Sequence, residues 1–448
     1  MQKYFENRGI RFMGRYLIWL VFVCASSAGA VDLLDVYKEA VSRDANYAAA
    51  KAQYLAIQER IPQAKSGKLP KINLQAKYDY NNIDADSAFS QGNRDFGSYQ
   101  YGVTGVQPLY RKQNDIAIDI AQKEVLRANI QLDLAGQQLM VRTLWLYIDA
   151  LKARTNLGTV RAQKLAVTEQ LELAKRNFAV GTATITDQRE AQARFDLVRA
   201  EELAAQNQVQ VTLDALQELT GSPIKGNLAP LKMPVSLDAP MPADVNVWIK
   251  RAMEQSLEIT LSQHDISIAQ SRVEINQYGK SPTVDLVGSV VDAYAGNSTF
   301  GSGSDTTSGV VGVQVQVPLF EGGKVNAQTR EAIAQQDQMF QLLEYTKRKV
   351  AQDTRVAYLD VTTGISRVKA FEEALASTKL QLESTKLGLE VGVRTAVDVL
   401  DAEKLLAESR RDMFGAVYDT IFARFKLQAA VGRLVEADVA AINGLLVR

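Results

Sequence analysis

Residue types that support catalysis or crosslinking are scarce in this chain of 448 residues. It has one cysteine, Cys24, and one histidine, His264. A single cysteine excludes an intramolecular disulfide, and His264 has no second metal ligand spaced around it on its polar segment. The sequence also contains no phosphate-binding loop with its lysine, no nucleophile elbow and no paired-cysteine motif. We therefore expect no enzyme, no cofactor and no metal site.

Net charge and long apolar runs are also lacking. Lys plus Arg and Asp plus Glu each number 51, so the chain has no excess of basic residues for nucleic acid. Residues 1–30 are typical of a secretory signal peptide, with an arginine-rich start, an apolar core and a cleavage site after Ala30. Cys24 lies inside this signal, and Val23 before it disfavours lipoprotein processing. Beyond residue 30 no run approaches the ~20 apolar residues of a spanning helix, so we expect any membrane crossing to use strands.

One passage occurs twice, about 210 residues apart, and this duplication predicts two structural repeats. We place the repeats at residues 31–221 and 245–432, joined by a Pro-rich linker at 222–244 that crosses the surface. Residues 433–448 form a C-terminal tail. Matched positions without a gap include Val180 and Val391, Gly181 and Gly392, Thr184 and Thr395, Asp187 and Asp398, Ala191 and Ala402, and, upstream, Tyr147 and Tyr358.

Each repeat is predicted to contain one very long helix. No proline occurs from Leu109 to Ser222 or from Leu319 to the C-terminus, and both stretches are rich in good helix formers. A continuous helix from residue 111 to 179, or from 322 to 390, would reach about 100 Å. Helices of this length need lateral packing against similar helices. Periodicity alone would equally suit a trimeric coiled-coil structural protein of the cell surface.

The segments between the helices favour a membrane barrel instead. Alternating apolar and polar residues predict strands at about 72–80 and 98–108 in the first repeat, and at about 283–294 and 309–319 in the second. Polar loops at 81–96 and 295–308 join each pair of strands. Four strands cannot close a barrel, and an open sheet edge cannot face lipid, so closure needs several chains. Two chains would supply eight strands and three would supply twelve.

The chain resembles the TolC-type outer-membrane efflux protein family over almost its whole mature length. The resemblance is carried by Val391-Gly-Val-Arg-Thr-Ala-Val-Asp398, by Val180-Gly-Thr-Ala-Thr-Ile-Thr-Asp187 and by Val317-Pro-Leu-Phe-Glu-Gly-Gly323. It implies a mixed α+β fold: a homotrimeric, twelve-stranded outer-membrane β-barrel, with four strands per chain, that continues into a long α-helical periplasmic tunnel. The implied location is the outer membrane of a Gram-negative bacterium, extending into the periplasm.

The resemblance also implies a function and partners. The chain would be the outer-membrane exit duct of a tripartite export system, working with a periplasmic adaptor (a membrane fusion protein) and an inner-membrane ABC transporter or proton-driven pump. The C-terminal stretch from Arg410 to Leu434 is similar to the branch that serves type I protein secretion, so we favour this route. The alternative within the class is a multidrug or small-molecule efflux pump.

The two Val-Gly turns should form the tips of helical hairpins and are the expected docking points for the adaptor. Gly181 and Gly392 supply the backbone angles that a tight turn needs. Asp187 and Asp398 follow in the first turn of the returning helix, where a carboxylate caps free N–H groups. Asp401 lies three residues after Asp398 on the same helix face, so a symmetric trimer would stack two rings of carboxylates. Such crowding raises carboxylate pKa values and attracts cations.

By resemblance, Asp398 and Asp401 match the family's aspartate rings at the pore constriction, which can also bind blocking multivalent cations. Arg394 and Asp187 match a charged lock that holds the entrance shut. Leu389 departs from the family pattern, since it stands where the best-known member has a lock tyrosine.

In the barrel, alternation predicts that one face of the last strand contacts outer-membrane lipid. The residues expected on that face are Val311, Val313, Val315 and Val317.

Overall fold

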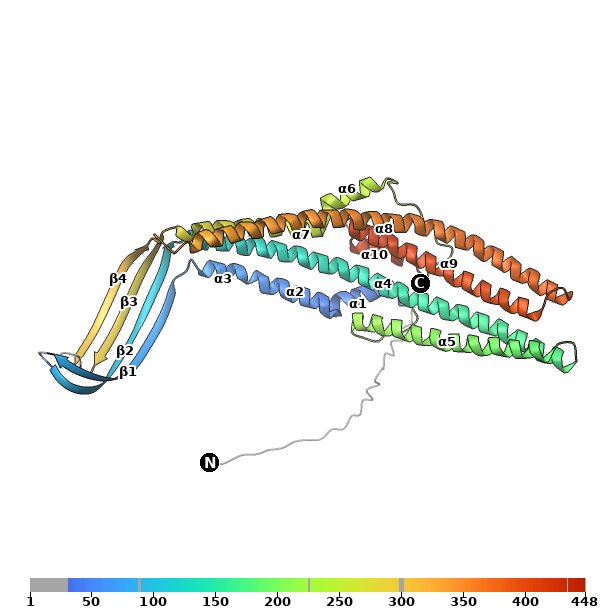
Figure 1. Cartoon of the computed structure of the whole chain (residues 1–448), viewed down its shortest axis with the longest axis horizontal. Helices are drawn as coiled ribbons and strands as arrows, with labels where there is room; N and C mark the ends of the chain where they lie inside the picture. Colours follow the sequence, from blue (N-terminus) through green and yellow to red (C-terminus); the bar gives the residue numbers. More distant parts are fainter. Residues whose placement is uncertain (1–30, 88–89, 225, 298–301, 433, 448) are drawn as a thin grey trace, which may run out of the picture.

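The structure is a computed structural model that describes residues 31–87, 90–224, 226–297, 302–432 and 434–447. A four-stranded sheet forms one end of the elongated molecule, helices occupy the rest of its length, and two hairpin tips form the other end (Figure 1). The predicted signal peptide, residues 1–30, lies outside the described residues. None of the helices in the described ranges is long and apolar enough to cross a membrane.

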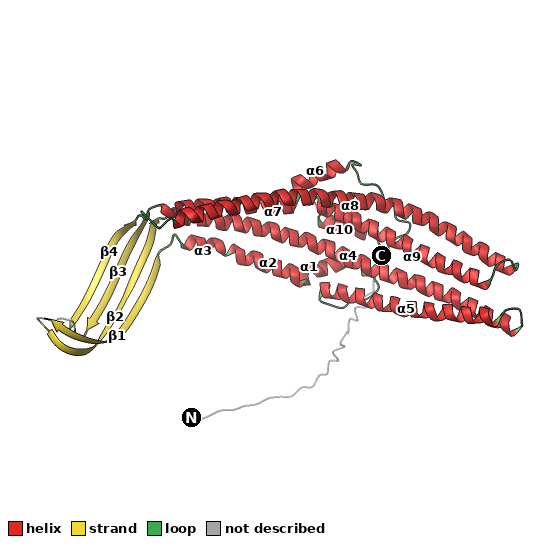
Figure 2. Ribbon diagram, viewed as in Figure 1, coloured by secondary structure: helices red, strands yellow, loops and turns green. Residues whose placement is uncertain are grey.

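The elements appear in two similar series, each with helices, two strands, a long helix and a returning helix (Figure 2). The first series is α1 (Leu33–Arg43), α2 (Ala45–Gln58), α3 (Arg60–Ser66), β1 (Lys71–Ser87), β2 (Ser90–Tyr110), α4 (Lys112–Ala179) and α5 (Ile185–Thr220). The second is α6 (Val245–Gln255), α7 (Leu257–Gln277), the 3-10 turn η1 (Tyr278–Lys280), β3 (Thr283–Ala295), β4 (Ser304–Gln316), α8 (Lys324–Glu390) and α9 (Ala396–Ala430), followed by α10 (Glu436–Asn443).

The strands pair antiparallel in the order β1-β2-β3-β4, and the first two are longer than predicted. Pairing of β1 with β2 continues to Ser87 opposite Ser90, so the prediction of a loop over residues 81–96 is wrong. The alternation of apolar residues ends near Tyr80, whereas backbone pairing needs no such alternation and continues through the polar residues beyond it. Strand β4 ends at Gln316, which leaves Val317 just outside it.

The register places most of the large apolar residues of the four strands on one face of the sheet, although Val106, Val287, Val291 and Val310 lie on the other. Leu74 lies opposite Val103, which lies opposite Val290, and the remaining apolar positions of this face follow at every second residue. On β4 this face carries Val311, Val313 and Val315, which are paired with Gly288, Leu286 and Val284 and are all exposed in the single chain. The opposite face carries mainly polar side chains, including Gln75, Thr104, Ser289 and Gln314.

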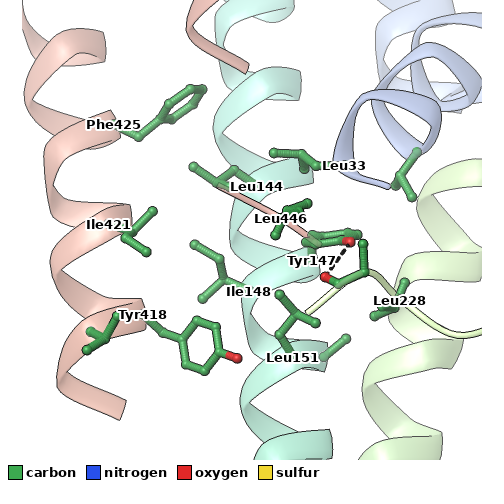
Figure 3. Packing of buried hydrophobic residues seen from close by; sticks show 14 of the residues in the cluster. Leu33, Leu144, Tyr147, Ile148, Leu151, Leu228, Tyr418, Ile421, Phe425 and Leu446 are labelled. Atoms are coloured by element: carbon green, nitrogen blue, oxygen red, sulfur yellow. Dashed lines mark hydrogen bonds between the residues drawn. The ribbon is translucent and has the colours of Figure 1, made fainter. Parts of the chain in front are cut away.

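A buried tyrosine joins the first long helix to the linker between the repeats. Tyr147 of α4 is 1% exposed and lies in the apolar cluster shown in Figure 3. Its hydroxyl proton is shared between two carbonyl oxygens, those of Val31 at 3.0 Å and Ala229 at 3.1 Å. Burial raises the pKa of Tyr147, which keeps the hydroxyl a neutral donor. Ala229 is fully buried, so the prediction that the linker only crosses the surface is wrong at this point.

The C-terminal residues pack in the same region. Leu446 is buried and forms an antiparallel bridge with Leu231 of the linker. Val439 of α10 is also buried in this apolar cluster. Residues 434–447 therefore complete the middle of the molecule, close to the start of the described chain at Val31.

Tyr358, the repeat partner of Tyr147, forms the matching contact with less burial, because its hydroxyl donates to the carbonyl oxygen of Ala243. We expect Tyr147→Phe to lower the free energy of unfolding by about 1–3 kcal/mol, since it removes the hydroxyl that donates to the buried carbonyl of Ala229. The Val31 carbonyl still accepts from the N–H of Ala229. Denaturation followed by circular dichroism measures the loss. Tyr358→Phe is the matched control and should cost less; equal losses would contradict the assignment.

Candidate functional site

Each hairpin tip begins with a glycine in the left-handed region. Gly181 has φ +77° and Gly392 has φ +79°, which other residues adopt only with strain. The N–H of Gly392 donates to the Leu389 carbonyl at 3.1 Å, and the N–H of Val393 donates to the Gly388 carbonyl at 2.9 Å. This pair of bonds is the Schellman motif, and it satisfies the last carbonyl groups of α8. The first tip has the same two bonds at the end of α4.

The returning helices α5 and α9 begin with identical capping boxes. The Asp398 N–H donates to the Thr395 hydroxyl at 3.2 Å, and the Thr395 N–H donates to the Asp398 carboxylate at 2.8 Å. Thr184 and Asp187 repeat these bonds at 3.2 and 2.8 Å. Both aspartates therefore cap their helices, as the sequence predicts.

The capping bonds also set the ionisation of the two carboxylates. The pKa of Asp398 is lowered, first by the backbone N–H of Thr395, then by its hydroxyl, with a smaller contribution from the charge of Arg394. The pKa of Asp187 is lowered by the corresponding groups of Thr184. Within one chain these bonds act against the rise in pKa that crowding between chains was expected to cause.

Asp401 lies beside a cation that the sequence analysis missed. Its Oδ1 accepts a hydrogen bond from Nη2 of Arg194 at 2.7 Å, an ion pair between α9 and α5. One sequence feature places an arginine near this position. Glu190 in the first copy matches Asp401 in the second, and Arg194 lies one helical turn after Glu190. Arg194 itself matches Leu405, so no comparison of the two copies alone would have paired them.

Arg394 is held close to the end of α8 by a glycine. A Cβ atom on Gly388 would lie 2.6 Å from Cγ of Arg394 and 3.3 Å from its Cβ. Gly388 is buried there, so only a residue without a side chain leaves room for Arg394. The first tip has Asn177 and Ala183 at these two positions, and thus neither the glycine nor the arginine.

The predicted lock residues are not paired with each other inside one chain. Within the described ranges, no ion pair joins Arg394 to Asp187. Leu389, the position at which the sequence departs from the expected lock, is half-buried against Leu382, Val399 and Ala402 and so contributes to the apolar contact between α8 and α9. No group of three potential metal ligands occurs among the described residues of one chain.

Residues 36–222 and 248–433 match the family model described as outer membrane efflux protein. The chain belongs to the outer membrane efflux protein family. The two matched ranges correspond to the two structural repeats, and the resemblance stated from the sequence is confirmed. As an outer membrane efflux channel the protein is not an enzyme; it lies in the outer membrane and its helices extend into the periplasm. Family membership replaces the alternative of a surface structural protein.

The similarity to other members of the family extends along nearly the whole chain. It is 32% identical to outer membrane protein TolC of Vibrio cholerae, with 94% of each chain covered. It is 29% identical to the alkaline protease secretion protein AprF of Pseudomonas aeruginosa, with 95% of this chain and 90% of the relative covered. The fold is similar to the Campylobacter jejuni CmeC outer membrane channel, with a TM-score of 0.77, 14% identity and coverage of 99% and 98%.

Arg394→Ser removes the charge of the predicted lock, and we expect it to raise single-channel conductance. We expect Gly388→Ala to raise single-channel conductance as well. The new methyl group displaces Arg394 near its backbone, where the side chain cannot easily move away, although no charge is lost. Planar-bilayer recordings of the purified channel measure the effect. Gly415→Ala, on α9 with open space around its Cβ position, is the matched control and should leave conductance unchanged. If Arg394→Ser raises the conductance and Gly388→Ala does not, Gly388 has no role in positioning Arg394.

Proposed function

We propose that the protein is a passive homotrimeric exit duct whose hairpin tips receive substrate from an adaptor and an inner-membrane transporter. The observation that carries the docking role is the pair of tips themselves, which have the same turn and cap and lie at the end farthest from the sheet (Figure 1). Val180, Val391 and Val393 are 74%, 65% and 76% exposed around Gly181 and Gly392. Exposed valines on a tip formed by rigid turns suit a protein partner.

The sheet supports the trimer and the barrel. β1 and β4 are the outer strands of the four-stranded sheet, so each has one unpaired edge in the single chain. Pairing β4 of one chain with β1 of the next closes twelve strands without an open edge. The exposed Val311, Val313 and Val315 then face lipid. Val317 joins them just below the end of β4.

The second hairpin provides the constriction and the lock. Asp398 and Asp401 of three chains form the carboxylate rings, and Arg394 of one chain pairs with Asp187 of its neighbour. The lowered pKa of Asp398 keeps its ring charged in the periplasmic pH range. An ionised ring favours cations at a narrow entrance.

We favour type I protein secretion as the route. The support is the similarity along nearly the whole chain to AprF, a protein named for alkaline protease secretion, together with the Arg410–Leu434 sequence. A multidrug or small-molecule efflux pump is the second candidate, because the family is described as efflux proteins.

Gene deletion separates the two routes. We expect the deletion strain to lose secretion of a protease exported by a type I system and to keep its susceptibility to dyes and antibiotics. Complementation with the intact gene is the control. Continued secretion together with increased susceptibility would reverse the order of the two routes.

Asp398→Asn should lower the cation-to-anion permeability ratio by about twofold or more and weaken block by multivalent cations. Since the pKa of Asp398 is lowered, its carboxylate loses charge only as pH falls below its ordinary value of about 3.9. Selectivity of the unmodified channel should thus persist down to about pH 4. Asp196→Asn, on the exposed side of α5, is the control. Loss of cation selectivity at pH 5 to 6 would instead show that repulsion between the crowded carboxylates raises the pKa of Asp398 more than its capping bonds lower it.

A further inference from the structure

We propose that Arg194 is an entrance latch that ties the two hairpin tips of one chain together through Asp401 and neutralises the charge of Asp401 toward the pore. This inference rests on the proposed function, because it assigns a role to a residue at the same entrance.

The first observation is the ion pair itself. Nη2 of Arg194 and Oδ1 of Asp401 are 2.7 Å apart, a charge-assisted hydrogen bond between residues 207 positions apart in the sequence. Within the described ranges it is the only ion pair between α5 and α9. The two side chains are 31% and 58% exposed, so water reaches the pair and it can break and form again.

The second observation is the apolar contact directly beneath the pair. Leu400, the residue before Asp401, is 3% exposed and packs among residues of the first hairpin that include Ala191, Val198 and Val167. Ala191 and Val198 lie three residues before and four residues after Arg194, on the same side of α5. The apolar contact therefore brings Asp401 to Arg194, and the ion pair covers its edge.

The third observation is the position of the other contacts between the hairpins. Lys152 of α4 pairs with Asp419 of α9, and the Thr155 hydroxyl lies 3.1 Å from that of Tyr418. These contacts are about 18 residues, or roughly 27 Å, farther from the tip along α9 than Asp401. The Arg194 pair and the apolar contact of Leu400 beneath it thus hold the part of the hairpins nearest the entrance, which the Lys152 and Thr155 contacts do not reach.

Each hairpin also has an ion pair of its own. Glu202 of α5 accepts from Lys164 of α4 at 2.7 Å, and Glu403 of α9 is 2.6 Å from Lys386 of α8. Loss of the Arg194 pair therefore leaves both hairpins intact and weakens only the contact between them, which the Leu400 packing then holds alone near the tips. Movement of the tips at this weakened contact opens an entrance without unfolding a helix.

The pair also changes the charge of the constriction. Among the described residues Asp398 forms no ion pair and is influenced only by the nearby charge of Arg394, whereas Asp401 is paired with Arg194. Each chain then presents one unpaired carboxylate to the pore instead of two. Removing Arg194 should free the second ring, which raises both cation selectivity and the affinity for blocking cations.

Arg194→Gln tests the latch in planar bilayers with the full-length purified channel. We expect conductance and the cation-to-anion permeability ratio each to rise about two- to fivefold, the factor that one exposed ion pair contributes to an equilibrium. Arg199→Gln is the matched control, since Arg199 is an exposed arginine on the same helix with no ion pair among the described residues. Arg194→Asp combined with Asp401→Arg restores the pair with reversed charges and should return conductance toward its original value.

A second measurement needs no current. Spin labels on Gln188→Cys of α5 and Lys404→Cys of α9, with Cys24 in the predicted signal as the only other cysteine, report the separation of the two tips. Arg194→Gln should shift the distance distribution to longer values, and Arg199→Gln should not. If Arg194→Gln and Arg199→Gln give the same conductance and the same distances, Arg194 is not a latch, whereas the proposed duct function is unaffected. If neither the unmodified channel nor any variant conducts ions, the proposed duct function is wrong. The distance distributions of the labelled proteins then test the latch by themselves.

Discussion

Every backbone N–H and C=O group of a strand in lipid must be hydrogen-bonded, and the rest of this structure depends on that constraint. The part of the chain that the structure describes has four strands, and the sheet order leaves β1 and β4 each with an unpaired edge. Copies of the chain can satisfy these edges by pairing around an axis, and the axis then orders the helices. Because α4 and α8 continue from the ends of β2 and β4, a closed barrel forces six long helices, two from each of three chains, to surround one lumen.

The middle of the molecule converts this arrangement into a stable unit. Tyr147 and its repeat partner Tyr358 each donate to the linker between the repeats, so one tyrosine of each long helix fixes the same crossing segment. The start of the described chain and its C-terminal residues pair with that segment as well. These contacts lie between the sheet and the tips (Figure 1), so the far ends of the hairpins are joined instead by the packing of Leu400 and by the Arg194–Asp401 ion pair.

The sequence predicted the features that repeat locally and missed those that depend on distant residues. Helix ends at the Val-Gly turns, the caps of Asp187 and Asp398 and the existence of four strands follow from patterns within a few residues. The extension of β1 does not, because pairing beyond the lipid needs no alternation of apolar residues. The pair of Arg194 with Asp401 joins residues 207 apart, and the space for Arg394 at Gly388 depends on the path of a turn that no propensity describes.

The two copies of the hairpin share the residues that fold the tip and differ in the residues that can hold it shut. Gly181 and Gly392, like Thr184 and Thr395, perform identical backbone tasks, so a change in either copy would be a folding change. Gly388 and Arg394 are replaced by Asn177 and Ala183 in the first copy, Asp401 is matched there by Glu190, and Arg194 is replaced by Leu405 in the second. In a ring of six identical hairpins every interface would have the same contact, so all six hairpins would move alike when the entrance closes. Contacts that alternate within and between chains reduce six-fold symmetry to three-fold, and a three-fold arrangement lets one hairpin of each chain move while the other stays fixed.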